Sequence, residues 1–242
     1  MLKKLIRLNL DDLLLWLAVE GGLFLVIQII IGCVMRFGRP ETSVTISCVL
    51  FPIVGGVLGV IAGSVHIVFS FDLALRFGQT RRRALGLALG VISFETAFAM
   101  ALGGALAALE RLLAPTLWAR LAERDGWAMG NLMPIPEGML VNGVPVSKKI
   151  LLIEEFTLDW CWWPLIFGAS IVIGVIVGAL LYRFGSKGGW VIWGICVAPM
   201  LLSQLLPKGI LTAGWLIPLL TALLLAAFLW SVWYLLHAVV RQ

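Results

Sequence analysis

The sequence predicts an all-α fold, a polytopic membrane helix bundle with six transmembrane helices and both termini in the cytoplasm. Three observations predict it. Of the 242 residues, 61% are hydrophobic and 13% are charged, whereas soluble domains are about half apolar and about a quarter charged. Apolar runs of about 20 residues recur, which suits membrane-spanning helices and exceeds the length of barrel strands. Lysine and arginine also gather near alternate span ends.

The elements follow in order. Residues 1–12 are expected to form a short amphipathic helix, with leucines toward one side and basic residues available to lipid headgroups. A cleaved signal peptide explains the next run less well, because that run is long, contains Glu20 and precedes five more. We treat residues 1–242 as one transmembrane domain. Its predicted spans cover residues 13–35, 44–71, 85–109, 160–182, 190–206 and 213–240.

The long connection 110–159 is polar and mixed in composition. It is too short for an independent domain with its own core, so we expect an extracytoplasmic segment that lies on the membrane surface or caps the bundle. Residues 111–124 can form an amphipathic helix, which Pro115 either begins or breaks. Three tryptophans at 160, 162 and 163 then mark the outer interface, where indole rings are enriched.

The orientation rests on basic residues near span ends. Ten of the eighteen lysines and arginines fall on the side assigned to the cytoplasm, and five of the other eight lie in the segment 110–159. Basic residues in long loops count less toward orientation, so the split that matters is ten to three. The pI of 9.3 and net charge of +5 therefore indicate a membrane protein and not a nucleic-acid partner. The four cysteines form no metal-type pair, and no metal site is predicted.

Two stripes of small residues recur at four-residue spacing. They consist of Gly55, Gly59 and Gly63 in the second span and Ser170, Gly174 and Gly178 in the fourth. Such stripes let helix backbones approach closely in lipid, where packing drives association. The pattern fits either static bundle packing or an interface that moves between helices or subunits.

Three ionisable residues, Glu20, His66 and Glu95, fall inside predicted spans. Each is costly in lipid and should face protein or water. Counted from the inner span ends, Glu20 and His66 lie at nearly the same depth and can pair, while Glu95 lies deeper. The three residues suit either a proton or cation relay or buried charges that neighbouring groups satisfy.

The connection after the second span carries more pattern than a topological turn needs. Residues 71–83 hold four arginines, a glycine that can end a helix and a short apolar patch. The tripeptide Arg-Phe-Gly occurs here and at two other span ends, at 36–38 and 183–185. In each copy an arginine can reach the headgroups and a glycine can end the helix. The connection predicts a docking surface on the cytoplasmic side.

No catalytic set stands out in the sequence. There is no HExxH, GxSxG or Walker motif, and only two histidines occur. We therefore predict no catalytic and no cofactor-binding residues in this chain. Energy for any transport would come from a partner or from an ion gradient.

The stretch Ala74-Leu75-Arg76-Phe77-Gly78-Gln79-Thr80-Arg81-Arg82 resembles a segment of small bacterial permeases of ATP-binding cassette (ABC) transporters. Those chains often carry an aliphatic residue and leucine, then Gly-x-Thr-Arg, at the inner end of an early span. The six-span layout is similar to the ABC-2-type class. One departure is the connection at 207–212, which is too short for the re-entrant outer helices that many of these permeases place there.

The resemblance implies a coupling helix that docks on an ATPase subunit. Its residues here would be Phe71, Leu75, Arg76, Phe77, Gly78, Thr80, Arg81 and Arg82. It implies a permease subunit in the bacterial cell membrane, with ATP and magnesium on a cytoplasmic ABC ATPase and a second permease chain, the same or related, as partner. The cargo would be a peptide, lipid or amphiphilic drug.

Two other functions remain open. An ion-coupled secondary transporter would use the three intramembrane ionisable residues and need no nucleotide. A membrane-embedded enzyme, or a resistance protein that sequesters its target, is the third hypothesis. The missing catalytic set counts against the enzyme.

Overall fold

The computed structural model describes residues 9–130, 140–141, 144–145, 150–205 and 216–237. The described chain is mostly helical, and five of its helices are long and apolar enough to cross a membrane. They cover Leu10–Gly38, Ser47–Arg76, Arg81–Leu121, Trp162–Phe184 and Pro218–His237. By the length and composition of these helices, the chain is a multi-pass helical membrane protein, as the sequence predicted.

The predicted spans compare with these helices as follows. The first four each correspond to one helix, and the ends differ by a few residues except that the third helix runs to Leu121 where the predicted span ends at residue 109. The predicted fifth span overlaps α8 (Ser186–Leu205), a helix of 20 residues that is not among the five. Helix α10 (Leu216–His237) covers most of the predicted sixth span. Six spans and the cytoplasmic position of both termini stay predictions, and most of the amphipathic segment 1–12 lies outside the described residues.

Three of the long helices change to π-helical hydrogen bonding for one turn. The turn η1 (Val34–Gly38) follows α2 (Leu10–Cys33), and η2 (His66–Ser70) joins α3 (Ser47–Val65) to α4 (Phe71–Arg76). The turn η3 (Ala114–Trp118) joins α5 (Arg81–Leu113) to α6 (Ala119–Leu121). Pro115 lies in η3 and has no N–H to donate, which disturbs the α-helical pattern there. Such turns are often found at functional sites.

The chain divides into two compact units. The first comprises residues 1–56 and 97–166, and the second comprises residues 57–96 and 167–242. Helices α3, α5 and α7 (Trp162–Phe184) each contribute to both units, because the division falls within these helices. Each unit is described by itself below.

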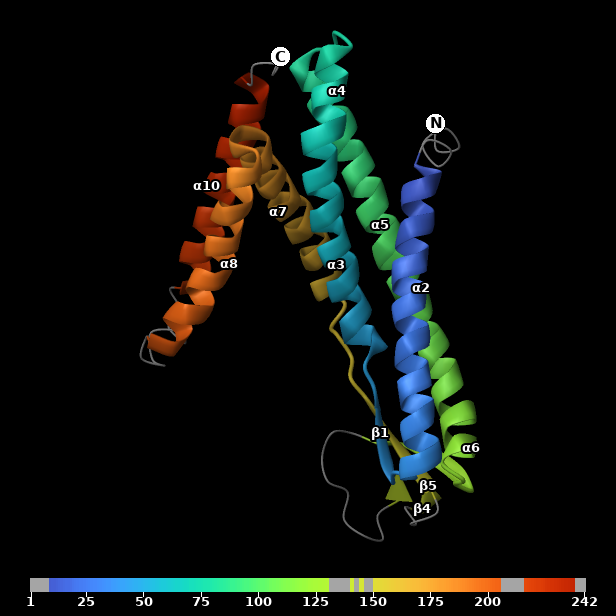
Figure 1. Ribbon diagram of the computed structural model, residues 1–242. Helices are drawn as coiled ribbons and strands as arrows, with labels where there is room; N and C mark the ends of the chain where they lie inside the picture. Colours follow the sequence, from blue (N-terminus) through green and yellow to red (C-terminus); the bar gives the residue numbers. More distant parts are fainter. Residues whose placement is uncertain (1–8, 131–139, 142–143, 146–149, 206–215, 238–242) are drawn as a thin grey trace. The chain divides into compact units, whose positions relative to one another are not determined.

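The first unit carries a small sheet at the end of α2 and α6 (Figure 1). Strands β1 (Thr42–Thr45), β5 (Ile150–Glu155) and β2 (Gly126–Gly130) pair in parallel in the order β1-β5-β2. Thr42 lies opposite Leu152, and Gly126 lies opposite Ile150. A two-stranded pair, β3 (Leu140–Val141) and β4 (Val144–Pro145), is separate. The all-α expectation did not include these strands.

A hydrophobic core fixes this sheet to the helices of the first unit. Its fully buried members include Trp118 from η3, Ile153 from β5 and Met35 from η1. The segment 110–159 therefore shares a core with the end of the first span, which the sequence analysis did not foresee. The predicted helix at 111–124 is interrupted by η3, so Pro115 lies at a change of helix type.

The second unit packs around a larger core, drawn from the hairpin of α4 and α5 together with α7 (Trp162–Phe184) and α10. Ile67, Phe71 and Ile92 are fully buried in it. The ring of Phe71 lies edge-on to that of Tyr182, with the centroids 5.8 Å apart. This core holds the chain on both sides of the α4–α5 turn.

The two small-residue stripes face each other within the second unit. A Cβ placed on Gly63 of α3 would lie 2.8 Å from the Cα of Gly174 in α7, which real side chains do not tolerate. A Cβ on Gly59 would lie 2.7 Å from Thr96 Oγ1, and one on Gly178 would lie 2.6 Å from Ile67 Cβ. The backbones of α3 and α7 therefore touch because these side chains are absent. Gly55, in the first unit, meets the backbone of Met100 at 3.2 Å.

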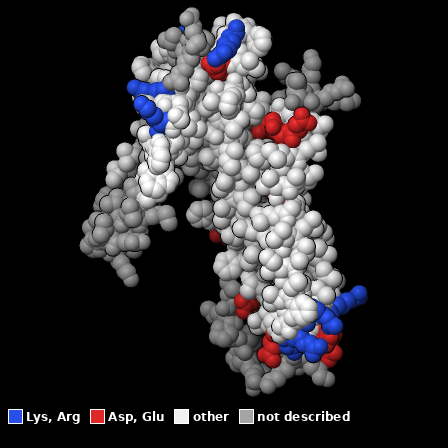
Figure 2. Space-filling model, in the orientation of Figure 1, with Lys and Arg blue, Asp and Glu red and all other residues white. Residues whose placement is uncertain are grey.

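The surface agrees with burial in lipid. On the face shown in Figure 2, lysines, arginines and acidic residues lie toward the helix ends, and a broad uncharged surface separates them. Many large apolar side chains of the described chain are exposed, among them Leu25, Ile29 and Leu229 at 61%, 64% and 66%. A soluble protein rarely exposes apolar surface on this scale.

Candidate functional site

The turn between α4 and α5 is the first candidate site. It separates two kinds of apolar residue. Phe71 and Leu75 are buried in the core of the second unit, with 0% and 8% of their surface exposed. Phe77, at the tip, is 78% exposed. Of the apolar residues predicted to dock on a partner, Phe71 and Leu75 hold the turn in place, and Phe77 is available for contact.

The turn has a defined helix end. The N–H of Gly78 donates to Leu75 O at 3.0 Å, and that of Gln79 donates to Ala74 O at 3.1 Å. Gly78 has φ of +76°, a left-handed conformation that glycine adopts without a Cβ clash. Gly185, in another Arg-Phe-Gly copy, has φ of +58° and also follows a helix end.

The base of the turn is braced by Asp72. Its carboxylate accepts a hydrogen bond from Arg76 Nε at 2.8 Å and another from the hydroxyl of Tyr182 at 3.2 Å. The first contact stays within α4, whereas the second reaches α7. Arg81 Nη1, at the start of α5, donates to Leu236 O of α10 at 3.4 Å. The turn is thus tied to two further helices of the second unit.

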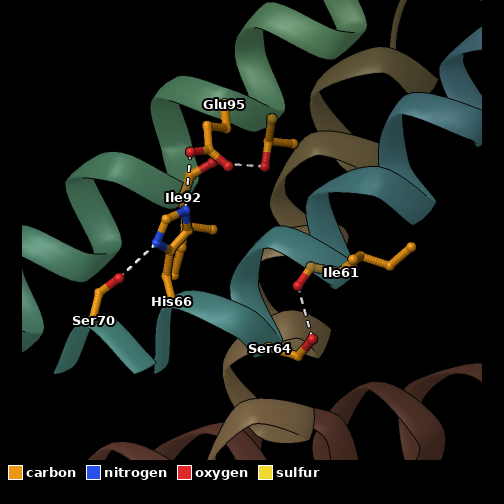
Figure 3. Close-up of polar contacts among 7 residues, drawn as sticks. Ile61, Ser64, His66, Ser70, Ile92 and Glu95 are labelled. Atoms are coloured by element: carbon orange, nitrogen blue, oxygen red, sulfur yellow. Dashed lines mark hydrogen bonds and ion pairs between the residues drawn. The ribbon is translucent and has the colours of Figure 1, made fainter. Parts of the chain in front are cut away.

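The second candidate site is a buried histidine–glutamate pair (Figure 3). His66 Nε2 lies 2.9 Å from Glu95 Oε1, and His66 Nδ1 lies 2.9 Å from Ser70 Oγ. Both residues of the pair are buried, Glu95 almost completely. The nearby hydroxyls of Ser64 and Thr96 donate to carbonyls of their own helices, at Ile61 and Ile92. Each of these two hydroxyls is therefore satisfied by the backbone of its own helix.

The expected partner of His66 was Glu20, and the structure brings Glu95 to it instead. The prediction compared only the depths of the residues along their spans and took no account of the direction of the side chains. His66 is ten residues before the end of α4 and Glu95 is fourteen residues after the start of α5, so their Cα atoms differ in depth by about 6 Å. In an α-helix each Cα–Cβ bond leans toward the N-terminus. In an antiparallel hairpin the two side chains therefore lean toward each other and close this gap.

Glu20 is fully buried, yet neither of its carboxylate oxygens has a hydrogen-bond partner among the described residues. Glu95 Oε2 is likewise without one. A buried carboxylate without a partner is costly in its charged form. The described part of the chain thus holds two buried acidic residues with carboxylate oxygens that lack a hydrogen-bond partner there.

Ser70, His66 and Glu95 are joined in the order of a hydrolase triad, and this bears on the enzyme hypothesis. Such a triad also needs donors for an oxyanion. Ser70 lies within a continuous run of helix from η2 into α4, where backbone N–H groups are committed to helical hydrogen bonds. The helical backbone therefore offers no oxyanion site at Ser70.

Sequence reasoning missed one polar network, centred on Glu110. This residue is almost fully buried in the first unit. Its carboxylate accepts a hydrogen bond from Gln28 Nε2 at 3.1 Å and from the backbone N of Ser47 at 3.0 Å. Gln28 Oε1 accepts in turn from the indole of Trp118 at 3.2 Å. The available signal was Gln28, a polar residue inside the first span.

The predicted third span ended at Leu109, so Glu110 was counted with the polar connection. In the structure α5 continues past it to Leu113. Glu110 binds the first N–H of α3, which a helix cannot satisfy internally. It joins α2, α3 and α5 of the first unit and has a structural role.

Comparison of the chain with protein-family models, with curated proteins and with solved structures found no match.

Proposed function

We propose that this chain is the permease subunit of an ABC transporter in a bacterial cell membrane. In this proposal it contributes to a substrate pathway with a second permease chain, and a separate cytoplasmic ATPase binds ATP and magnesium. The five membrane-length helices suit a transport role, and the α4–α5 turn offers a contact for the ATPase. The substrate would be a peptide, lipid or amphiphilic drug, in keeping with the apolar spans.

The observation that carries the proposal is the exposure of Phe77 on a braced turn. A phenylalanine that is 78% exposed gains free energy when a partner covers it. The turn is held by buried Phe71 and by the contacts of Asp72, so little conformational freedom is lost on docking. Arg82 is exposed beside it and can add a rim interaction with an acidic partner surface.

The test compares the phenylalanines of two copies of the tripeptide Arg-Phe-Gly, at 76–78 and at 36–38. Phe77→Ala should lower ATPase co-purification and ATP hydrolysis in the complex by about tenfold or more, because a buried interface phenylalanine is a strong anchor. Phe37→Ala is the matched control: Phe37 is 85% exposed, also lies between arginine and glycine, and ends the first span. It should leave both measurements unchanged.

Arg82→Ala should have a milder effect that shrinks as salt is raised, because exposed charges are screened. Insertion of each variant in the membrane is checked by its yield and its elution volume in detergent. Equal ATPase binding by wild type and Phe77→Ala would remove the support for the permease.

The second candidate function, an ion-coupled secondary transporter, is favoured by the buried pair of His66 and Glu95. A histidine bound to a buried carboxylate can take up and release a proton with a local change of partners. Glu20, buried and without a hydrogen-bond partner among the described residues, would be a further proton acceptor. This candidate requires no nucleotide.

Proton flux separates the two candidates. The purified chain is placed in liposomes that contain a pH-sensitive dye, and a membrane potential is imposed without ATP. An ion-coupled transporter should acidify or alkalinise the interior, and Glu95→Gln should abolish the change because the amide binds no proton at neutral pH. A permease that depends on an ATPase gives the same trace as empty liposomes, with or without the substitution.

A further inference from the structure

A surface cavity opens beside the α4–α5 turn, within the second unit. Its volume is about 670 Å³, and the end of α10 forms its other wall. The residues that line it are Leu75, Gln79, Thr80, Arg81, Arg82, Leu236 and His237. This size exceeds that of a phosphate group and falls within the range of small-molecule sites.

The polar lining of the cavity is cationic. Two arginines contribute to it, and no aspartate or glutamate is among the lining residues described. Asp72, the acidic residue of α4, is already bonded to Arg76 and Tyr182. The cavity therefore has the electrostatic character of an anion site.

Several donors in the cavity are uncommitted within the described part of the chain. Arg82 and the hydroxyl of Thr80 make no hydrogen bond to a described residue, whereas Arg81 uses Nη1 alone, on Leu236 O. His237 donates through Nδ1 to Trp233 O at 2.8 Å, so the N–H of its neutral ring is already used. The start of α5 lies here, and its first N–H groups also favour an anion.

We propose that this cavity binds the phosphate of an anionic phospholipid headgroup, with Arg81 and Arg82 as the main ligands and the hydroxyl of Thr80 as a supporting donor. The bidentate geometry of a guanidinium suits phosphate oxygens. The proposal goes beyond the permease function, since it concerns the chain alone and needs no ATPase.

The surroundings favour a lipid over a soluble anion. Leu75 and Leu236 supply apolar walls next to the cations. Along α10, Leu229 is 66% exposed and Trp233 is 58% exposed, which gives acyl chains an apolar surface that leads away from the cavity. A free phosphate would use the cations and gain nothing from these walls, whereas a phospholipid uses both.

The test measures lipid binding to the purified chain by native mass spectrometry. The detergent-solubilised protein is titrated with phosphatidylglycerol, with phosphatidylcholine, or with inorganic phosphate as a competitor. Phosphatidylglycerol should bind at least tenfold more tightly than phosphatidylcholine, and millimolar phosphate should not displace it. Arg82→Gln should weaken phosphatidylglycerol binding about fivefold, and the double variant R81Q/R82Q about 25-fold.

The matched control is Arg83→Gln, which removes the same charge one residue further along α5, at a position that does not line the cavity. It should bind phosphatidylglycerol as the wild type does. Arg82→Gln keeps the proposal testable if Arg81→Gln loosens α10, because Arg82 makes no bond within the described chain. Equal weakening by Arg83→Gln would show a diffuse charge effect and overturn the proposal. Equal binding of both lipids, or displacement by phosphate, would also overturn it.

Discussion

At the scale of single residues, the buried polar groups divide into two kinds. Glu110 has both carboxylate oxygens bonded, to Gln28 and to Ser47. Glu20 has neither oxygen bonded to a described residue. A satisfied buried carboxylate stabilises the fold that supplies its donors, whereas an unsatisfied one opposes burial in its charged form. The two residues should therefore respond oppositely to substitution.

Glu110→Ala should lower stability by about 1–3 kcal/mol, because it leaves the Ser47 N–H and the Gln28 amide buried without an acceptor. Glu20→Gln should leave stability unchanged or raise it. Thermal unfolding of the two purified variants in the same detergent measures both effects. A melting temperature for Glu110→Ala equal to that of the wild type would mean that water or lipid replaces the carboxylate.

At the scale of elements, the contact of α3 with α7 leaves no room for a side chain at Gly63. It was predictable that the six small residues lie on two stripes, because four-residue spacing places them on one face of a helix. Their pairing with each other depends on how the helices are arranged, and the sequence gives no register. The same limit explains the sheet: β1 and β5 are more than 100 residues apart, and strands this short are recognisable only by their partners.

Gly63→Ala should destabilise the chain by about 1–3 kcal/mol, because the added Cβ meets the Gly174 backbone, which cannot rotate away. Gly90→Ala is the control. Gly90 is exposed in α5 with nothing within 4 Å of its Cβ position, so alanine should raise stability by up to about 1 kcal/mol through its helix propensity.

Gly59→Leu should lower stability more than Gly63→Ala does. A Cβ at position 59 would already lie too close to Thr96 and Ser170, and leucine adds three more carbon atoms. Melting temperatures and the monodisperse fraction in gel filtration report the order of the three variants. If Gly63→Ala and Gly90→Ala have the same melting temperature, α3 and α7 can move apart without loss of stability, and their contact does not determine stability.

At the scale of the whole molecule, composition and run length were enough to predict a helical membrane protein. The predicted topology depends on the ten-to-three split of basic residues. The fifth predicted span is the weakest part of the assignment, because α8 is not among the membrane-length apolar helices. A change in the number of spans would move the C-terminus to the other side and leave the first three helices as predicted.

Two exposed arginines test the orientation of those helices. Arg82 lies at the start of α5, and Arg120 lies at its far end, in α6. In a background without the four native cysteines, Arg82→Cys should react with a membrane-impermeant maleimide only after the cells are opened. Arg120→Cys should react in intact cells. Labelling of both from one side would contradict a spanning helix between them.

The parallel pairing of β1 with β5 has a mechanical consequence. Strand β1 leads into α3 through the single residue Ile46, whereas β5 reaches α7 through residues 156–161. Six fully extended residues reach at most about 20 Å. An axial displacement of the start of α3 would act in shear on all the hydrogen bonds between β1 and β5 at once. The same displacement of the start of α7 would first change the conformation of the linker 156–161. The sheet therefore restricts axial movement of α3 more directly than that of α7.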